Sequence, residues 1–138
     1  MKDDNTNNQF MKIVGIDFGL KKVGIAIADG SLAEPLVVVR YNDSKILLGE
    51  IKKIVEKEKI EKIVVGISEG EMAEKTREFM GELKKEIAIS VEEFDETLST
   101  LDAQRLAIES GMKRAKRRKM EDALAAAVML QSYVDCFE

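Results

Sequence analysis

The chain has 138 residues, which is long enough for one hydrophobic core, and its single cysteine excludes an intrachain disulfide. It contains no histidine, which excludes Ser-His-Asp and Cys-His hydrolysis, histidine-ligated zinc enzymes and nucleases with a histidine general base. The formal net charge of −4 does not by itself favour nucleic acid as a partner. Enzymatic chemistry would have to come from carboxylates, Lys, Ser, Thr or a metal, and carboxylate oxygens prefer hard cations such as Mg²⁺ or Mn²⁺.

The ends and the apolar segments of the chain bear on its domain organisation and location. Residues 1–11 are polar and rich in asparagine, so they are expected to form a disordered leader before a single domain at 12–138. The opening residues do not resemble a signal peptide, and no apolar stretch reaches the roughly 18 residues of a membrane span. We therefore expect a cytoplasmic protein with no membrane partner.

Three short apolar segments open the predicted domain. Strands are predicted at 12–18, 23–29 and 35–40, and the third begins at the only proline. A glycine-containing loop, residues 19–22, joins the first two strands and suits a hairpin. Strands that follow one another so closely favour an antiparallel meander.

The rest of the chain alternates between helical and extended patterns. Apolar residues at helical spacing, strong capping signals and fully apolar runs predict, in order, helix 43–59, strand 62–67, helix 71–86, strand 87–95, helix 99–110 and helix 120–136. Helical crossovers generally add strands in parallel. The order βββαβαβαα therefore predicts an α/β fold with a mixed five-stranded sheet, in which two parallel strands extend the meander and helices cover both faces.

Acidic residues at two strand ends are candidates for a functional site. Asp17 lies within the first apolar strand, where an unpaired carboxylate costs several kcal/mol of desolvation, so a metal or catalytic role is favoured over a solvent-facing strand end. Asp95 and Glu96 end the fifth strand, at the kind of sheet edge where sites gather. The alternative for this pair is an acidic cap on the helix that follows.

Two further acids are weaker candidates on position alone. Asp122 opens the last helix, where the helix dipole alone would favour an acid. The residues after it are small or apolar, however, so this helix should pack closely on the sheet and press Asp122 towards the first strand. Glu69 follows the fourth strand and could reach the same edge, but a turn before the next helix is the preferred interpretation.

Six of the seven residues from 113 to 119 are positively charged, which sets this segment apart from an otherwise acidic chain. Such a cluster attracts a phosphate backbone without reading its sequence, although a solvated loop between two helices is the alternative. We interpret the cluster as a nucleic-acid contact, to which the first hairpin adds further cations. The predicted nucleic-acid-binding residues are Lys21, Lys22, Lys113, Arg114, Lys116, Arg117, Arg118 and Lys119.

Four blocks of the sequence, in order, resemble the YqgF family of RuvX-type proteins, which are described as Holliday junction resolvases or pre-16S rRNA nucleases. The blocks are Gly15-Ile16-Asp17-Phe18-Gly19 with Val23-Gly24-Ile25-Ala26-Ile27-Ala28-Asp29, then Val64-Val65-Gly66-Ile67, then Asp95-Glu96-Thr97-Leu98-Ser99-Thr100, and finally Asp122-Ala123-Leu124-Ala125-Ala126 with Leu130-Gln131. The resemblance covers residues 12–136 and implies an RNase H-like fold. It also implies acidic site residues at Asp17, Asp95, Glu96 and Asp122.

The resemblance leads to a mechanistic hypothesis. Asp17, Glu96 and Asp122 would hold one or two Mg²⁺ or Mn²⁺ ions for phosphodiester hydrolysis, with Asp17 bridging both ions and Asp95 serving as a further ligand or as an orienting residue. Two features depart from the family pattern. Thr97 stands where members usually have Arg, and Ser68-Glu69-Gly70 is shorter than the usual stretch after the central strand.

Several functions remain open at this point. The leading hypothesis is a metal-dependent endonuclease that processes the 5′ end of pre-16S rRNA, with the ribosome as an associated partner. One alternative is a Holliday junction resolvase acting on branched DNA, and another is a non-catalytic nucleic-acid-binding or transcription factor. An actin-like nucleotide binder is disfavoured because the chain has no room for the second domain that such proteins need. Sequence does not distinguish a monomer from a homodimer.

Overall fold

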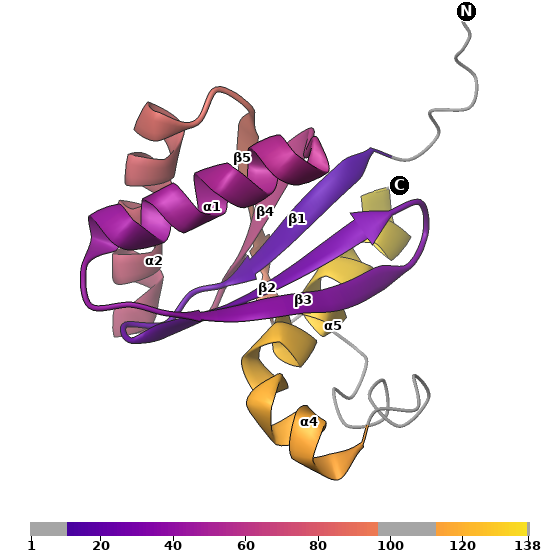
Figure 1. The fold of residues 1–138 in the computed structure, drawn as a ribbon. Coiled ribbons are helices and arrows are strands. Elements are labelled where there is room, and N and C mark those ends of the chain that lie inside the picture. The colour runs from indigo at the N-terminus through magenta and orange to yellow at the C-terminus, as the bar shows by residue number, and fades with distance from the viewer. Residues whose placement is uncertain (1–10, 97–112, 138) are drawn as a thin grey trace, which may run out of the picture.

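The structure is a computed structural model that describes residues 11–96 and 113–137 (Figure 1). Residues 1–10 of the predicted leader, the predicted helix at 99–110 and Thr97 lie outside the described residues. Met11, the last residue of the predicted leader, is half-buried and packs against the hydrophobic core. Within the described ranges, no helix is long and apolar enough to cross a lipid bilayer.

A single five-stranded sheet, in the order β3-β2-β1-β4-β5, forms the centre of the described structure. Its strands are β1 (Lys12–Asp17), β2 (Lys22–Asp29), β3 (Ala33–Arg40), β4 (Lys62–Ile67) and β5 (Ser90–Asp95). The first three pair antiparallel, whereas β4 runs parallel to both β1 and β5. The predicted mixed sheet, with a meander extended by two parallel strands, is therefore confirmed.

Helices cover both faces of the sheet (Figure 1). Helices α1 (Ser44–Glu58) and α2 (Glu71–Glu86) lie on one face, and α5 (Glu121–Phe137) lies on the other. A carboxylate oxygen of Asp43 caps α1 by accepting a hydrogen bond of 2.9 Å from the backbone N–H of Lys45. The sheet thus separates two hydrophobic clusters, one under α1 and α2 and one under α5.

The alternation of side chains along β1 shows how the sheet divides these clusters. Val14 and Ile16 belong to the cluster under α1 and α2, whereas Ile13 belongs to the cluster under α5. Gly15 faces α5 as well, because a Cβ added there would lie 2.8 Å from the Cβ of Leu130. The period of two places Asp17, at the end of β1, on the α5 face.

Some boundaries differ from those predicted from the sequence. β5 begins at Ser90, so residues 87–89 are not part of the strand. β3 begins at Ala33, and Pro35 lies inside it, next to a register shift that pairs Ile25 with Val37 and Ala26 with Pro35. Proline is tolerated there because β3 is an edge strand and because the pairing is irregular at this point. A ladder hydrogen bond from the N–H that proline lacks is therefore not required.

The start of α5 makes an unusually close contact with the sheet. A Cβ atom added to Gly24 of β2 would overlap the backbone oxygen of Asp122 and crowd the backbone nitrogen of Ala123. Only glycine leaves room for the helix backbone at this point. This contact determines how far the first turn of α5, and with it Asp122, stands above the sheet.

We expect Gly24→Ala to destabilise the fold by on the order of 1–3 kcal/mol, because the added methyl group must push the helix backbone away from the sheet. Urea unfolding monitored by circular dichroism measures the change in the free energy of unfolding. Gly49→Ala is the matched control: Gly49 is an exposed position inside α1 with open space around its would-be Cβ. It should stabilise the protein by up to about 1 kcal/mol. Equal effects of the two substitutions would contradict the close contact.

Candidate active site

Asp17 occupies the centre of the candidate site, at the carboxyl end of β1. It pairs in register with Gly24 of β2, so its neighbour on that strand has no side chain to compete for space. The parallel register that joins Ile16 to Val65 places Gly66 of β4 on its other side. Asp17 therefore lies half-buried between two glycines on the α5 face of the sheet.

Glu96 reaches the same place from the end of β5. It directly follows the strand and has 3₁₀-helical backbone, and its side chain folds over β4, since a Cβ on Gly66 would lie 2.7 Å from Glu96 Oε1. Its carboxylate is hydrogen-bonded to Asp17. Two acids separated by 79 positions in the sequence are thereby brought into direct contact.

Asp122, in the first turn of α5, approaches the same group from above the sheet. Its charge acts on Asp17, and its own carboxylate Oδ2 lies 3.0 Å from the Nζ atom of Lys22. Lys22 is the first residue of β2 and lies on the same face as Gly24. Three of the four predicted acidic site residues therefore gather at one edge of the sheet, together with a lysine.

The electrostatic consequence appears at Asp17. The pKa of the Asp17 carboxyl is raised to about 8, first by burial and then by the charge of Glu96, the hydrogen bond with Glu96 and the charge of Asp122. A short contact between two carboxyl groups requires one of them to hold a proton, because two adjacent negative charges repel in a low-dielectric site. This edge of the sheet therefore carries more negative charge than its surroundings neutralise.

As they stand, the Asp, Glu and Cys residues within 11–96 and 113–137 include no trio that closes around a common point as metal ligands do. Asp122 is engaged with Lys22, while Asp17 and Glu96 are engaged with each other. The three carboxylates are neighbours, with Lys22 paired to Asp122 and with Glu96 acting on Asp17.

Asp95 lies on the opposite face of the sheet from Glu96. Successive residues of a strand point to opposite faces, so Glu96 follows Phe94 towards α5, whereas Asp95 follows Glu93 towards α2. There Asp95 lines a groove of about 520 Å³ with the Ser68-Glu69-Gly70 loop and Arg77. The adjacent acids of the pair thus belong to different environments, which their neighbouring positions in the sequence did not reveal.

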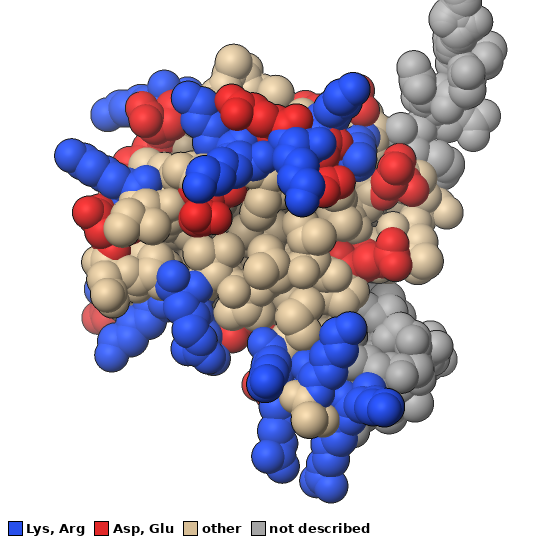
Figure 2. Space-filling view, viewed as in Figure 1, with Lys and Arg blue, Asp and Glu red and all other residues tan. Residues whose placement is uncertain are grey.

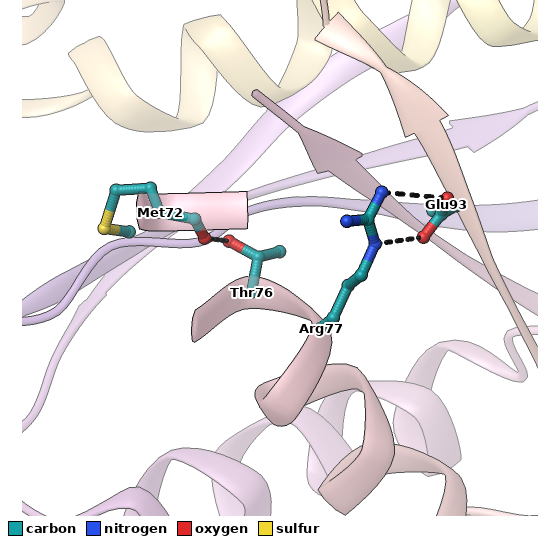
Figure 3. Close-up of polar contacts among 4 residues, drawn as sticks. All are labelled: Met72, Thr76, Arg77 and Glu93. Carbon is teal, nitrogen blue, oxygen red and sulfur yellow. Dashed lines mark hydrogen bonds and ion pairs between the residues drawn. The ribbon is translucent and has the colours of Figure 1, made fainter. Parts of the chain in front are cut away.

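The groove that contains Asp95 is bounded by a polar link between α2 and β5 (Figure 3). Arg77 donates two hydrogen bonds to Glu93, of 3.1 Å from Nε and 3.4 Å from Nη2. On the same helix, the hydroxyl of Thr76 donates a 2.6 Å hydrogen bond to the backbone oxygen of Met72. Glu69 is exposed in the loop before α2, as preferred from the sequence, and does not join the three acids.

The cationic segment predicted as a nucleic-acid contact forms a short helix, α4 (Arg114–Lys119), which ends just before α5 begins (Figure 1). Figure 2 shows this helix covered with basic side chains that point outward from the body of the molecule. The exposed cations are Lys113, Arg114, Lys116, Arg118 and Lys119, while the side chain of Arg117 lies outside the described residues. Lys21, in the β1–β2 hairpin, is also exposed.

Sequence reasoning missed two parts of the site. Gly24 and Gly66 provide the space into which Asp122 and Glu96 fit, and the signal was available as glycines inside otherwise apolar strands. Lys22 was predicted to bind nucleic acid, and in the structure it pairs with Asp122. No feature of the sequence distinguished it from Lys21.

Comparison with known proteins places the chain in a family. The family model described as "RuvX: Holliday junction resolvase" matches residues 11–136. A protein of Halothermothrix orenii is 37% identical over 91% of this chain and 95% of its own length, and one of Oceanobacillus iheyensis is 33% identical over 91% and 98%. Both carry the name "Putative pre-16S rRNA nuclease", as does a Clostridium botulinum protein that is 36% identical.

Solved structures with the same architecture include two resolvases. RuvC of T. thermophilus in complex with a Holliday junction has a TM-score of 0.66 at 19% identity, covering 92% of this chain and 96% of that one. The fowlpox virus resolvase in complex with Holliday junction DNA has a TM-score of 0.59 at 13% identity, covering 91% and 98%. These likenesses confirm the RNase H-like fold. The family match and the curated relatives, which span nearly the whole sequence, show that this chain is a member of the RuvX family.

Proposed function

We propose that this protein is a divalent-metal-dependent endonuclease for structured RNA and that it processes the 5′ end of pre-16S rRNA. The observation that carries the proposal is the meeting of Asp17, Glu96 and Asp122 at one sheet edge, where burial and the neighbouring acids raise the pKa of Asp17 to about 8. The curated relatives named for this activity support the choice of substrate.

The donor chemistry of the three carboxylates at this edge suits a hard divalent cation, although among the described residues they do not converge on a common point as they stand. Asp17 and Glu96 share a hydrogen bond that one proton makes possible, and a cation could replace that proton while relieving the repulsion among the three acids. Carboxylate oxygens are the ligands that Mg²⁺ and Mn²⁺ prefer, and the chain contains no histidine to favour softer metals. When bound, such an ion supplies charge neutralisation at the scissile phosphate and an activated water.

The geometry supports different roles for the four predicted acids. Asp17, Glu96 and Asp122 are the proposed ligands because they share the α5 face. Asp95 points to the α2 side of the sheet, so we propose that it helps to hold the end of β5 in place and does not bind the cation. The cations of α4 would contact the phosphate backbone of the substrate just before the chain reaches Asp122.

Branched DNA is the second candidate substrate, because the matching family model is described as a Holliday junction resolvase. The proposed carboxylate chemistry and the phosphate contacts would serve either substrate. A cleavage competition between a pre-rRNA fragment and a four-way DNA junction, at equal concentration and salt, decides between them.

Asp17→Asn should reduce Mn²⁺-dependent cleavage of a pre-16S rRNA fragment by at least about 10³-fold, because the variant loses a charged ligand while keeping the size of the side chain. Gel-based turnover with Mn²⁺, and with EDTA as the metal-free arm, measures this. Glu69→Gln is the control: it removes an acid from a nearby exposed loop and should leave turnover unchanged. Full activity of Asp17→Asn would refute the mechanism, and binding of the fragment by the wild type without any cleavage would favour a non-catalytic binding protein.

The raised pKa of Asp17 predicts how stability depends on pH without metal. Between about pH 4 and pH 8 the unfolded carboxyl is ionised while the native one keeps its proton, so the free energy of unfolding should fall as pH rises through this window. The contribution of Asp17 is on the order of a few kcal/mol. In urea unfolding with EDTA at pH 5 and pH 8, Asp17→Asn should show a smaller decline than the wild type. An equal decline in both proteins would contradict the buried, protonated state.

The basic residues of α4 should contribute to nucleic-acid affinity through counterion release. Replacing Arg114, Lys116 and Arg118 with Gln should lower the slope of log affinity against log salt by about two to three, as measured by fluorescence anisotropy with a structured RNA. The control replaces the exposed Lys52, Lys53 and Lys57 of α1, on the other face of the sheet, which changes net charge equally. If both triple variants weaken binding by the same amount, α4 is not the contact surface.

A further inference from the structure

Lys22 is an exposed basic residue whose ammonium group reaches an acid of the candidate site. Its Nζ is 3.0 Å from Asp122 Oδ2. Lys22 begins β2 two residues before Gly24, so it points to the same face as the contact between Gly24 and α5. A lysine is therefore positioned where the proposed function requires a cation.

The two partners of this pair differ in how firmly they are held. The backbone of Asp122 rests directly on Gly24, which fixes the point from which its short side chain extends. Lys22 reaches it through a flexible four-carbon stem from a position at the start of a strand. If the pair separates, the longer side chain of Lys22 has the greater freedom to move.

The pair is also weak enough to be exchanged. The side chains of Lys22 and Asp122 are 46% and 31% exposed, so water screens their attraction. An ammonium group and a divalent cation bound to the same carboxylate oxygen would repel each other at close range. A divalent ion offers the carboxylates a shorter and more highly charged partner than the ammonium group does.

We propose that Lys22 is an exchangeable cation of the site: it pairs with Asp122 while no divalent ion is bound, and it is released when such an ion binds. The inference rests on the proposed function, since it takes Asp122 to be a ligand. Released from Asp122, the ammonium group of this exposed residue would be free to contact a phosphate of the substrate. Lys22 is thus a positioning residue for Asp122 in one state and a substrate contact in the other.

The first test compares the affinity of the full chain for Mn²⁺ by isothermal titration calorimetry. Lys22→Met removes the competitor for Asp122 and should tighten Mn²⁺ binding by about fivefold, the factor that corresponds to the loss of one exposed ion pair. Lys21→Met, which makes the same change in net charge one residue away, should stay within about twofold of the wild type. Adding Asp122→Asn to each should abolish the difference between the two lysine variants.

The second test follows the lysine itself by acylation with an amine-reactive ester, read residue by residue by mass spectrometry. In the wild type, Mn²⁺ should increase acylation of Lys22 severalfold and leave Lys21 unchanged. In Asp122→Asn, Lys22 should react quickly with or without Mn²⁺. This measurement needs no substitution at Lys22, so it does not depend on the folding of that variant.

The outcomes separate this inference from the proposed function. Suppose that Mn²⁺ binds in an Asp17-dependent manner, but that Lys22→Met binds it as tightly as the wild type and Mn²⁺ does not change the acylation of Lys22. The exchange is then refuted, while the proposed metal site is supported. If the wild type binds no Mn²⁺, both proposals fail.

Discussion

The close contact between Gly24 and the first turn of α5 is the constraint on which the site depends. It places the backbone of Asp122 directly against Gly24, which is the residue of β2 that pairs with Asp17. Asp122 follows Asp17 by 105 positions, so no local interaction could bring them together. The small residues Ala123, Ala126 and Ala127 are buried, which allows α5 to lie this close along its first turns. The packing of α5 on the sheet therefore determines how close the carboxylates of Asp17 and Asp122 lie.

The site shows the compromise between folding and function that such packing requires. Hydrophobic packing under α5 brings acidic groups together, and the structure accommodates them with a raised pKa at Asp17 and an ion pair between Lys22 and Asp122. Both arrangements lower the repulsion without filling the site with apolar side chains. A fold selected only for stability would have little reason to keep carboxylates at this edge of the sheet. Their presence supports a functional role that offsets the electrostatic destabilisation.

Much of the fold could be predicted from the sequence because its elements have clear periods. The apolar strand Lys62–Ile67 and the helix Glu71–Glu86 have the predicted bounds, since each has an unambiguous pattern and clear ends. The start of β5 was placed too early, because Ile87 and Ile89 extend the alternating pattern of the strand backwards. In the structure these two residues pack against the core without pairing to a neighbouring strand. Pro35 was taken as the start of a strand, because a register shift cannot be recognised from one strand alone.

The candidate site could be predicted only in part, and the reason lies in the geometry of strands. Asp17 was recognisable because a charged residue in an apolar strand is unusual. Asp95 and Glu96 were grouped because they are adjacent, yet adjacent residues at a strand end face opposite sides of the sheet. The ion pair of Lys22 with Asp122 depends on the position of α5, which only the assembled fold determines.

The junction between α4 and α5 connects the two halves of the proposed function. The chain changes from a cationic helix that ends at Lys119 to an acidic turn that begins at Glu121, with Met120 between them. Hydrogen bonds from Met120 N–H to the oxygen of Lys116 and from Leu124 N–H to the oxygen of Met120 continue the helical pattern across this change. A phosphate backbone attracted by α4 would therefore lie next to the carboxylate of Asp122. The net charge of −4 conceals this arrangement, because it averages a basic helix with the acidic site at its end.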